Sequence, residues 1–248
     1  MIRILAVIPT LRDDPSKTIE SLIAQTIPIQ RILVAVGSKN LYNFLTSHSV
    51  EWNHPQIQFI YVKPSSDICV GKRIAKALNV VLRSVNLEEF DYLLRVDADT
   101  VLPDHFVEEN LKLNAHIVGS AGFALLIKVK PFLHLSRGRF QEVCAEDSYL
   151  LYSFMQNGCS AKPWKVMPKL LRESGKPYSW KYFYVRGVEM YKIGYEPLHV
   201  IGSLKNDSRN VFSALAYLCT LMSRSQRYPF SKWVFRKQLE KLTKLLKL

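Results

Sequence analysis

Two carboxylates spaced one residue apart, Asp97 and Asp99, directly follow the apolar run at residues 92–96 of this 248-residue chain. Carboxylate oxygens are preferred ligands of hard divalent cations, which keep coordination sites open for phosphate oxygens. The alternative is a structural turn in which Asp99 caps a helix beginning near Asp104. Taken alone, the pair indicates either a cation site for a phosphorylated ligand or a capped turn.

A second acidic pair, Glu146 and Asp147, opens the predicted helix in the segment AEDSYLLYSF. The free N–H groups at a helix N-terminus stabilise a carboxylate in its charged form. An ionised carboxylate held beside a substrate hydroxyl can accept the hydroxyl proton. The alternative is that both acids only stabilise the helix start.

Hydrophobic periodicity predicts the elements that position these acids. Strands are expected at residues 4–8, 31–36, 57–62 and 92–96, and helices at residues 16–25 and 71–83. Alternating strands and helices imply right-handed crossovers and a mostly parallel sheet with helices on both faces. Ligands of such sheets bind at the carboxyl ends of the strands, where Asp97 and Asp99 are expected.

Four segments, in this order, resemble the motifs of the family 2 glycosyltransferases, which have the nucleotide-sugar-binding GT-A fold. They are ILAVIPTLRDDPSKTIESLIAQTIPIQRILVAVGS, VGKRIAKALNVVL, DYLLRVDADTVLPDHFVEENL and SRGRFQEVCAED. The resemblance covers roughly residues 1–160. It implies an α/β, Rossmann-like GT-A fold and an acceptor loop in the last of the four segments.

The resemblance also implies roles for the acidic residues. Asp97 would contact the ribose and diphosphate, and Asp97 and Asp99 would hold Mn²⁺ or Mg²⁺ against the diphosphate. Asp147 matches the general base of the family, supported by Glu146. His199 is a candidate third metal ligand, because some GT-A enzymes use a His late in the chain.

Five further residues match the nucleotide-sugar-binding positions of the family. They are Pro9, Thr10 and Arg12 after the first strand, and Gly71 and Lys72 on the facing loop. The chain departs from the family at the end of its second strand, where Ala35 and Val36 replace an acidic pair that contacts base and ribose. Asp67 is a candidate substitute. UDP, GDP and dTDP sugars therefore all remain open.

Charge divides the chain into two parts. Residues 1–161 hold 16 Lys+Arg and 16 Asp+Glu, whereas residues 162–248 hold 18 and 5 and supply the whole net charge of +13. We therefore expect a GT-A catalytic core at 1–161 and a basic, helical region at 162–248 that binds an acceptor or an anionic membrane surface. The alternative is a basic surface that is merely solvated.

The last 25 residues are predicted to form a basic amphipathic helix. Eight Lys+Arg and one acid accompany an apolar stripe at Phe235, Leu239, Leu242 and Leu246. Such a helix lies on a membrane surface or packs on the body of the protein through its stripe.

The cysteines and apolar runs indicate location. Cys69, Cys144, Cys159 and Cys219 show no CxxC spacing, so reduced thiols in a reducing compartment are expected. No apolar run approaches the ~20 residues that cross a bilayer. We expect a cytoplasmic protein that is peripheral at the inner face of a membrane.

Together these observations predict a metal-dependent inverting glycosyltransferase of the hexosyltransferase type. Its expected partners are a UDP- or GDP-type nucleotide sugar and a glycan or lipid-linked acceptor. One rival is a nucleotidyltransferase of similar fold, although IPTLRDDPSK lacks a Gly-rich phosphate loop. The other is a nucleic-acid-binding protein, which would explain the basic region but not the two acidic motifs.

Overall fold

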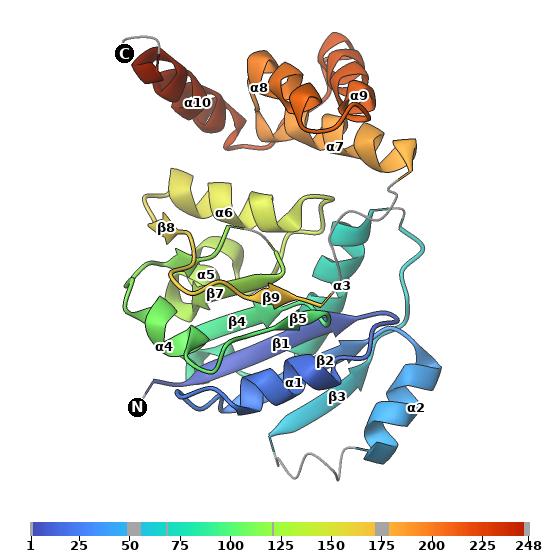
Figure 1. Ribbon diagram of the computed structural model, residues 1–248, viewed down its shortest axis with the longest axis vertical. Helices are drawn as coiled ribbons and strands as arrows, with labels where there is room; N and C mark the ends of the chain where they lie inside the picture. Colours follow the sequence, from blue (N-terminus) through green and yellow to red (C-terminus); the bar gives the residue numbers. More distant parts are fainter. Residues whose placement is uncertain (1, 49–55, 68, 121, 172–178, 246–248) are drawn as a thin grey trace. The chain divides into compact units, whose positions relative to one another are not determined.

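A computed structural model describes residues 2–48, 56–67, 69–120, 122–171 and 179–245. The chain forms two compact units, Met1–Ser174 and Gly175–Leu248 (Figure 1). The sequence places this division at residue 161. The boundary lies further along the chain because two short strands, β8 (Ala161–Lys162) and β9 (Lys169–Leu170), pair within sheets of the first unit.

A mostly parallel sheet forms the centre of the first unit. Its strand order is β3-β2-β1-β4-β7-β6-β8, and β1, β2, β3 and β4 run parallel while β7 is antiparallel to β4 and β6. The bounds are β1 (Ile4–Thr10), β2 (Arg31–Val36), β3 (Ile57–Tyr61), β4 (Tyr92–Val96), β6 (Ile117–Val118) and β7 (Ala124–Lys128). Strand β5 (Thr100–Val101) pairs with β9 in a second small sheet. The predicted α/β class is confirmed.

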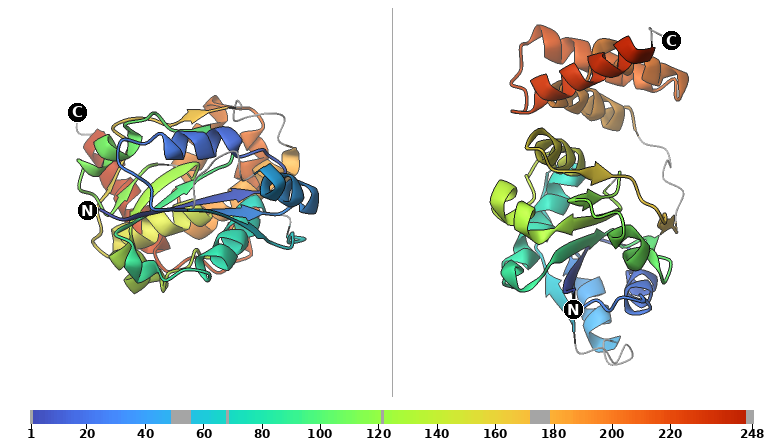
Figure 2. Two further views of the ribbon diagram at one scale, coloured as in Figure 1. Left: turned by 90° about the horizontal axis from the view of Figure 1, so that it is seen from below. Right: turned by 90° about the vertical axis from the view of Figure 1, so that its left-hand side faces the viewer.

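Helices cover both faces of this sheet, as predicted (Figures 1 and 2). Side chains of α1 (Ser16–Ile23), α2 (Lys39–His48) and α4 (Phe106–Leu111) join one buried cluster. Those of α3 (Val70–Leu82), α5 (Val129–Ser136) and α6 (Glu146–Gln156) join the other. Strands β1, β2, β4 and β7 are buried on both faces, which explains their continuous apolar runs, whereas the edge strand β3 is partly exposed.

The predicted bounds hold to within two residues, but two segments differ. The apolar sequence after Gly119 also predicts a long strand, but β7 begins only at Ala124, because Gly119 has a φ of 132° and interrupts the extended backbone. The sequence LSRGRF, which opens the segment expected to hold the acceptor loop, also predicts a loop, but it starts inside α5, which ends where Arg137 takes a left-handed φ of 55°. Helix α2 was not predicted, because its sequence KNLYNFLTSH is largely polar.

A disulfide joins Cys69 to Cys144, with Cα atoms 5.2 Å apart. The expectation of four reduced thiols is therefore wrong for this pair, whereas Cys159 and Cys219 are free. The sequence separation is 75 residues, so no local spacing could indicate the pairing. The bridge ties the residue before α3 to the segment that leads into α6.

We expect thiol titration in denaturant to detect two thiols before reduction and four after it. Replacing Cys69 by serine should lower the free energy of unfolding by about 2–4 kcal/mol, because the bridge restricts the unfolded chain. The matched control is Cys219→Ser at an exposed free thiol, which should change little. Four reactive thiols without reductant would contradict the assignment.

The second unit is helical. It contains α7 (Trp180–Ile193), α8 (Pro197–Gly202), α9 (Asn210–Met222) and α10 (Ser231–Leu245), with a 3₁₀ turn at Ser203–Lys205. Helix α7 packs along α9, and α10 also contacts α7. Among the described residues, no helix combines the length and apolar character needed to span a bilayer.

The predicted apolar stripe of α10 is only partly buried. Phe235 and Leu242 are half-buried and Leu239 is exposed, whereas Leu246 lies outside the described residues. The better-buried contacts of this segment come from Phe230 and Val234. The sequence allows α10 either to pack on the protein or to lie on a membrane. The structure shows that part of this helix packs on the other helices of its own unit.

Candidate active site

The carboxyl ends of four parallel strands meet at one edge of the sheet, where the predicted ligand residues lie. Thr10 ends β1 and pairs in register with Val36 of β2, and Asp97 directly follows β4. The Gly37 N–H donates to the Thr10 carbonyl at 2.8 Å, joining the β1 and β2 ends. This edge is where ligands of parallel α/β sheets bind.

The turn that carries Asp97 and Asp99 is anchored on both sides. Thr18 Oγ1 of α1 donates to the Ala98 carbonyl at 2.8 Å. The Asp99 carbonyl accepts the N–H of Leu171, next to β9, at 2.8 Å. Both acidic residues are half-buried. These contacts hold the backbone of the turn from which the two carboxylates project.

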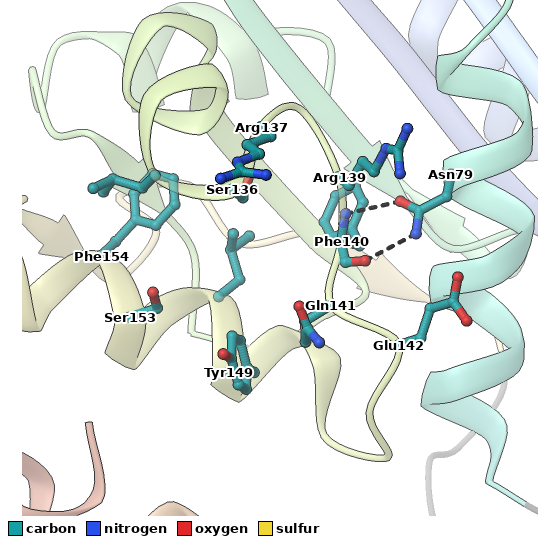
Figure 3. A pocket seen from close by; sticks show the side chains of 12 residues that line it. Asn79, Ser136, Arg137, Arg139, Phe140, Gln141, Glu142, Tyr149, Ser153 and Phe154 are labelled. Atoms are coloured by element: carbon teal, nitrogen blue, oxygen red, sulfur yellow. Dashed lines mark hydrogen bonds between the residues drawn. The ribbon is translucent and has the colours of Figure 1, made fainter. Parts of the chain in front are cut away.

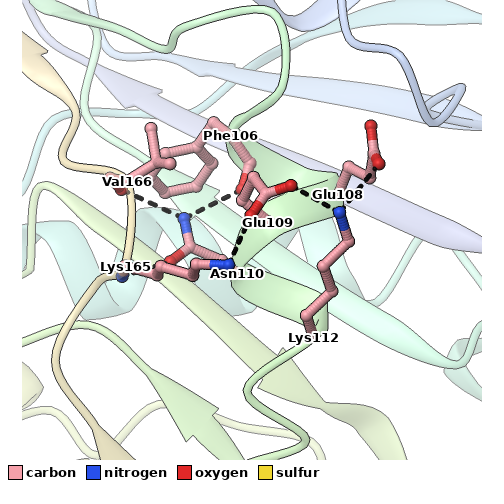
Figure 4. Close-up of polar contacts among 7 residues, drawn as sticks. All are labelled: Phe106, Glu108, Glu109, Asn110, Lys112, Lys165 and Val166. Atoms are coloured by element: carbon pink, nitrogen blue, oxygen red, sulfur yellow. Dashed lines mark hydrogen bonds and ion pairs between the residues drawn. The ribbon is translucent and has the colours of Figure 1, made fainter.

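A polar network on α4 holds the segment between β8 and β9 in place (Figure 4). The Asn110 amide donates to the carbonyls of Phe106 at 2.8 Å and Val166 at 3.1 Å, and its oxygen accepts the Lys165 N–H at 2.8 Å. Lys165 Nζ also pairs with Glu109 at 2.6 Å. This segment leads into β9 and so supports the acidic turn.

Arg95 connects the two acidic motifs. This residue of β4 has a side chain only 2% exposed, and its Nη2 lies 2.9 Å from Glu146 Oε1 and 3.5 Å from Asp97 Oδ1. Gly122 makes room for it, since a Cβ there would lie 2.9 Å from Nη2. Sequence reasoning missed Arg95. The available signal was a cation in an otherwise apolar strand.

Asp147 lies beside Glu146 at the start of α6 and is half-buried. One of its carboxylate oxygens accepts the Gly122 N–H at 3.0 Å, and the other accepts the Ser148 N–H at 2.6 Å. These bonds fix the orientation of the carboxylate. Each oxygen keeps a second lone pair that can accept a proton.

The cluster is electrostatically crowded. Burial raises the pKa of Asp97, against the opposing charge of Arg95, and the charges of Asp99 and Asp147 raise it further. Burial likewise raises the pKa of Glu146 to about 7, although Arg95 opposes the rise. The cluster therefore holds several carboxyl groups against one guanidinium, which favours a divalent cation.

The residues present fit a hard cation. Asp97 and Asp99 offer carboxylates on a fixed turn, and their mutual repulsion would be relieved by a bound cation. Within the described ranges, no group of three or more His, Cys, Asp or Glu side chains could hold a metal ion. Mg²⁺ sites commonly combine one or two carboxylates with substrate phosphates, which is the arrangement these two acids suit.

Gly71, expected on a loop, lies in the first turn of α3 and approaches the acids there. A Cβ at this buried position would lie 2.0 Å from Glu146 Oε2 and 2.2 Å from the Cys144 carbonyl oxygen. Only a glycine therefore allows the start of α3 to approach the acids this closely. Lys72 pairs with Asp67 at 2.9 Å. Lys76, Ser65 and Lys72 together hold the pKa of Asp67 below its usual range.

The predicted nucleotide-binding residues after β1 lie at the same sheet edge. Pro9 and Thr10 are buried, whereas Arg12 is exposed. Thr10 Oγ1 donates to the Asp13 carbonyl at 2.5 Å, which shapes the turn after the strand. The structure thus brings Thr10 and Asp97 to adjacent strand ends.

A cation and two aromatic rings lie at the ends of β2 and β3, where the acidic pair of the family is missing. Lys39 Nζ is 5.3 Å from the ring centroid of Tyr42 and 5.2 Å from that of Tyr61. The two rings meet edge to face at 6.0 Å. Sequence reasoning missed this group, because only the pairing of β2 with β3 brings Tyr61 to Lys39.

His199 belongs to the second unit, on α8, where it is exposed. Its ring centroid lies 4.8 Å from that of Tyr195. Its role as a third metal ligand stays a prediction.

The segment expected to form the acceptor loop lines a cavity of about 660 Å³ (Figure 3). Arg137, Arg139 and Tyr149 face it, and the Asn79 amide of α3 anchors the loop. Asn79 donates to the Phe140 carbonyl at 2.9 Å and accepts the Phe140 N–H at 2.8 Å. The cavity is not lined by any of the four clustered acids, Asp97, Asp99, Glu146 and Asp147.

Comparison with solved structures identifies the fold. No protein-family model matches the chain, and no curated protein matches it. Structural neighbours include glycosyltransferases, and the chain has the GT-A-type fold of nucleotide-diphospho-sugar transferases, as predicted.

Three of these neighbours illustrate the likeness. The mannosyltransferase PcManGT from Pyrobaculum calidifontis, solved with GDP-Man and Mn²⁺, matches with a TM-score of 0.58 at 14% identity, over 96% of this chain and 80% of its own. S. aureus TarS matches with a TM-score of 0.54 at 11% identity, and the match covers 78% of this chain and 40% of TarS. Glucosyl-3-phosphoglycerate synthase from Mycobacterium tuberculosis was solved with Mn²⁺, UDP and phosphoglyceric acid. It matches with a TM-score of 0.50 at 13% identity, and the match covers 70% of this chain and 72% of the synthase.

Removing Arg95 should destabilise the protein strongly. Arg95→Met leaves the buried Glu146 without its cation and also removes the contact with the half-buried Asp97, and breaking a buried ion pair in this way costs about 3–5 kcal/mol in the free energy of unfolding. The double variant Arg95→Met/Glu146→Gln should recover a large part of that loss. Urea denaturation measures both, and equal stabilities of the two variants would contradict the coupling.

Proposed function

We propose that this chain is a metal-dependent inverting glycosyltransferase of the hexosyltransferase type, using a UDP- or GDP-type sugar donor. The observation that carries the proposal is the cluster in which Arg95 contacts both Asp97 and Glu146, with Asp99 on the same turn and Asp147 next to Glu146. This cluster lies at the edge where sheets of this kind bind ligands.

The donor side of the site is formed by the strand ends. Asp97 and Asp99 would hold Mn²⁺ or Mg²⁺, which when bound neutralises charge on the diphosphate leaving group. Pro9, Thr10 and Arg12 would border the nucleotide on the β1 side, and Gly71 and Lys72 would contribute from the first turn of α3. Lys39 and Tyr61 offer a cation and an aromatic ring to the base.

The acceptor side depends on Asp147. As the acceptor oxygen forms its bond to the anomeric carbon, the bond from that carbon to the diphosphate breaks, and the acceptor proton passes to the Asp147 carboxylate. Attack from the side opposite the leaving group inverts the anomeric configuration. Arg95 would act as a positioning residue that holds Glu146 beside this base.

The acceptor is proposed to be a glycan or a lipid-linked molecule. The cavity beside α6, with Arg137, Arg139 and Tyr149, suits a polar or anionic acceptor group. An anionic membrane surface is the proposed partner of the basic second unit. A cytoplasmic location stays a prediction, and the disulfide removes the argument for it from reduced thiols.

A screen of nucleotide sugars tests the proposed function. With Mn²⁺ present, one or a few donors should be hydrolysed slowly to the nucleoside diphosphate, and EDTA should stop this release. Transfer to an acceptor should give a product of inverted anomeric configuration. A protein that hydrolysed and bound none of the donors, yet bound RNA with a steep salt dependence, would instead be a nucleic-acid-binding protein.

A further inference from the structure

Helix α9 carries its apolar side chains on the outside of the second unit. Val211, Leu215, Leu218 and Met222, at i, i+4, i+7 and i+11, are 45%, 53%, 49% and 74% exposed. We define the α9 surface as the exposed residues of this helix: Val211, Phe212, Leu215, Leu218, Cys219, Leu221 and Met222. No exposed residue of α9 is charged.

Packing inside the unit holds α9 in this rotation. Ser213 Oγ donates to the Phe183 carbonyl at 2.7 Å, and the Tyr217 hydroxyl donates to the Tyr195 carbonyl at 2.7 Å. Gly187 of α7 allows the backbones to approach, since a Cβ there would lie 2.0 Å from the Ser213 carbonyl oxygen. Rotating α9 to bury its apolar side would break these contacts. The packing of the second unit therefore keeps the α9 surface exposed.

This pattern is the reverse of a water-facing helix, which turns its apolar side toward the core. Polar residues of α9 are buried instead, among them Asn210, Ser213 and Thr220. Helix α8, which packs against α9, adds exposed Leu198 and Ile201. Contiguous exposed apolar residues mark a contact with a protein or a membrane.

The charge of the unit selects between these two partners. Residues 175–248 contain 14 Lys+Arg and 4 Asp+Glu. Those acids are engaged within the unit: Glu189 with Lys192, Asp207 with Arg209, Glu240 with Lys237, and Glu196 with the Leu198 N–H. A second copy would bring like charges together, whereas an anionic bilayer attracts them.

Cations also lie at both ends of α9. Lys205 precedes the helix and Arg224 follows it, and both are exposed. Long basic side chains of this kind reach headgroup phosphates while neighbouring apolar side chains enter the acyl boundary. The apolar surface and its flanking cations therefore match a lipid interface rather than a dry protein contact.

We propose that the α9 surface docks on an anionic phospholipid bilayer, with Leu215 and Leu218 entering the acyl boundary and Lys205 and Arg224 contacting headgroup phosphates. The purpose of this docking rests on the proposed function, since it would bring the site to a lipid-linked acceptor. Lipid binding itself requires no transfer activity and is measured without donor.

The test uses the full chain with a fluorescent label on Cys219, which lies in the α9 surface, and Cys159→Ser to leave one reactive thiol. Vesicles containing phosphatidylglycerol should shift the label emission to the blue, and phosphatidylcholine vesicles should not. Leu215→Gln/Leu218→Gln keeps the charge and should weaken binding at least about tenfold. The matched control, Leu239→Gln on α10, should bind as the parent does.

Donor hydrolysis, assayed separately without vesicles, should be equal in all these variants, so loss of lipid binding and failure of the proposed function are distinguishable. Unchanged vesicle binding in the double variant would overturn the proposal in favour of charge alone. A concentration-dependent dimer lost in the double variant, without vesicle binding, would assign the surface to a second copy. No emission change with anionic vesicles in the labelled parent would also overturn it, even if the double variant failed to fold.

Discussion

Replacing Asp147 by asparagine is expected to slow sugar transfer to a hydroxyl acceptor by about 10² to 10⁴, the usual effect of losing general-base catalysis. The amide has the same shape but cannot take the acceptor proton. Its oxygen can still accept the Gly122 N–H, so the start of α6 should keep its position. Transfer rates at saturating donor, with donor affinity measured by calorimetry, separate the two effects.

The matched control is Glu20→Gln, which removes one exposed acid from α1 and should leave the rate unchanged. A rate for Asp147→Asn within twofold of the parent on a hydroxyl acceptor would refute the assigned role. If the acceptor is a lipid phosphate, its nucleophilic oxygen is already ionised. The loss should then be smaller and appear mainly in the KM for the acceptor.

Asp99→Asn is expected to lower transfer by a thousandfold or more, because a bound cation supplies several kcal/mol of charge stabilisation to the leaving group and each ~1.4 kcal/mol is worth tenfold in rate. Donor affinity with Mn²⁺ should fall to the value measured in EDTA. Calorimetry with and without metal gives both affinities, and thermal unfolding confirms that the variant is folded.

Asp104→Asn provides the control for this substitution, since Asp104 is an exposed acid five residues further along the same segment. It should retain both activity and metal dependence. Full activity of the parent protein in EDTA, or a metal-dependent affinity that survives in Asp99→Asn, would show that the DxD pair does not hold the cation.

The sheet and the place of the acids could be predicted because both follow from local pattern. Continuous apolar runs define buried parallel strands, and a carboxylate pair after such a run must lie at a strand end. The cation in the apolar strand 92–96 marks Arg95 as unusual, but its pairing could not be predicted, because the partner Glu146 comes from a helix far along the chain. The bridge between Cys69 and Cys144 is likewise a product of tertiary contact.

The second unit shows a different limit. An apolar run such as 211–222 predicts a helix with that side buried, whereas in α9 the contacts of Ser213 and Tyr217 turn it outward. From its charge and apolar stripe, the sequence leaves α10 open between contact with a membrane surface and packing on the body of the protein. The structure instead places the more exposed apolar residues on α9, which only packing could reveal.

The most direct measurement is a crystal structure of the protein with Mn²⁺ and the nucleoside diphosphate of its preferred donor, with anomalous data collected at the manganese edge. We expect one strong peak at coordination distance from the Asp99 carboxylate and the diphosphate oxygens, with Asp147 facing the vacant sugar position. A nucleotide bound away from the ends of β1 and β4, or a metal peak touching neither Asp97 nor Asp99, would contradict it.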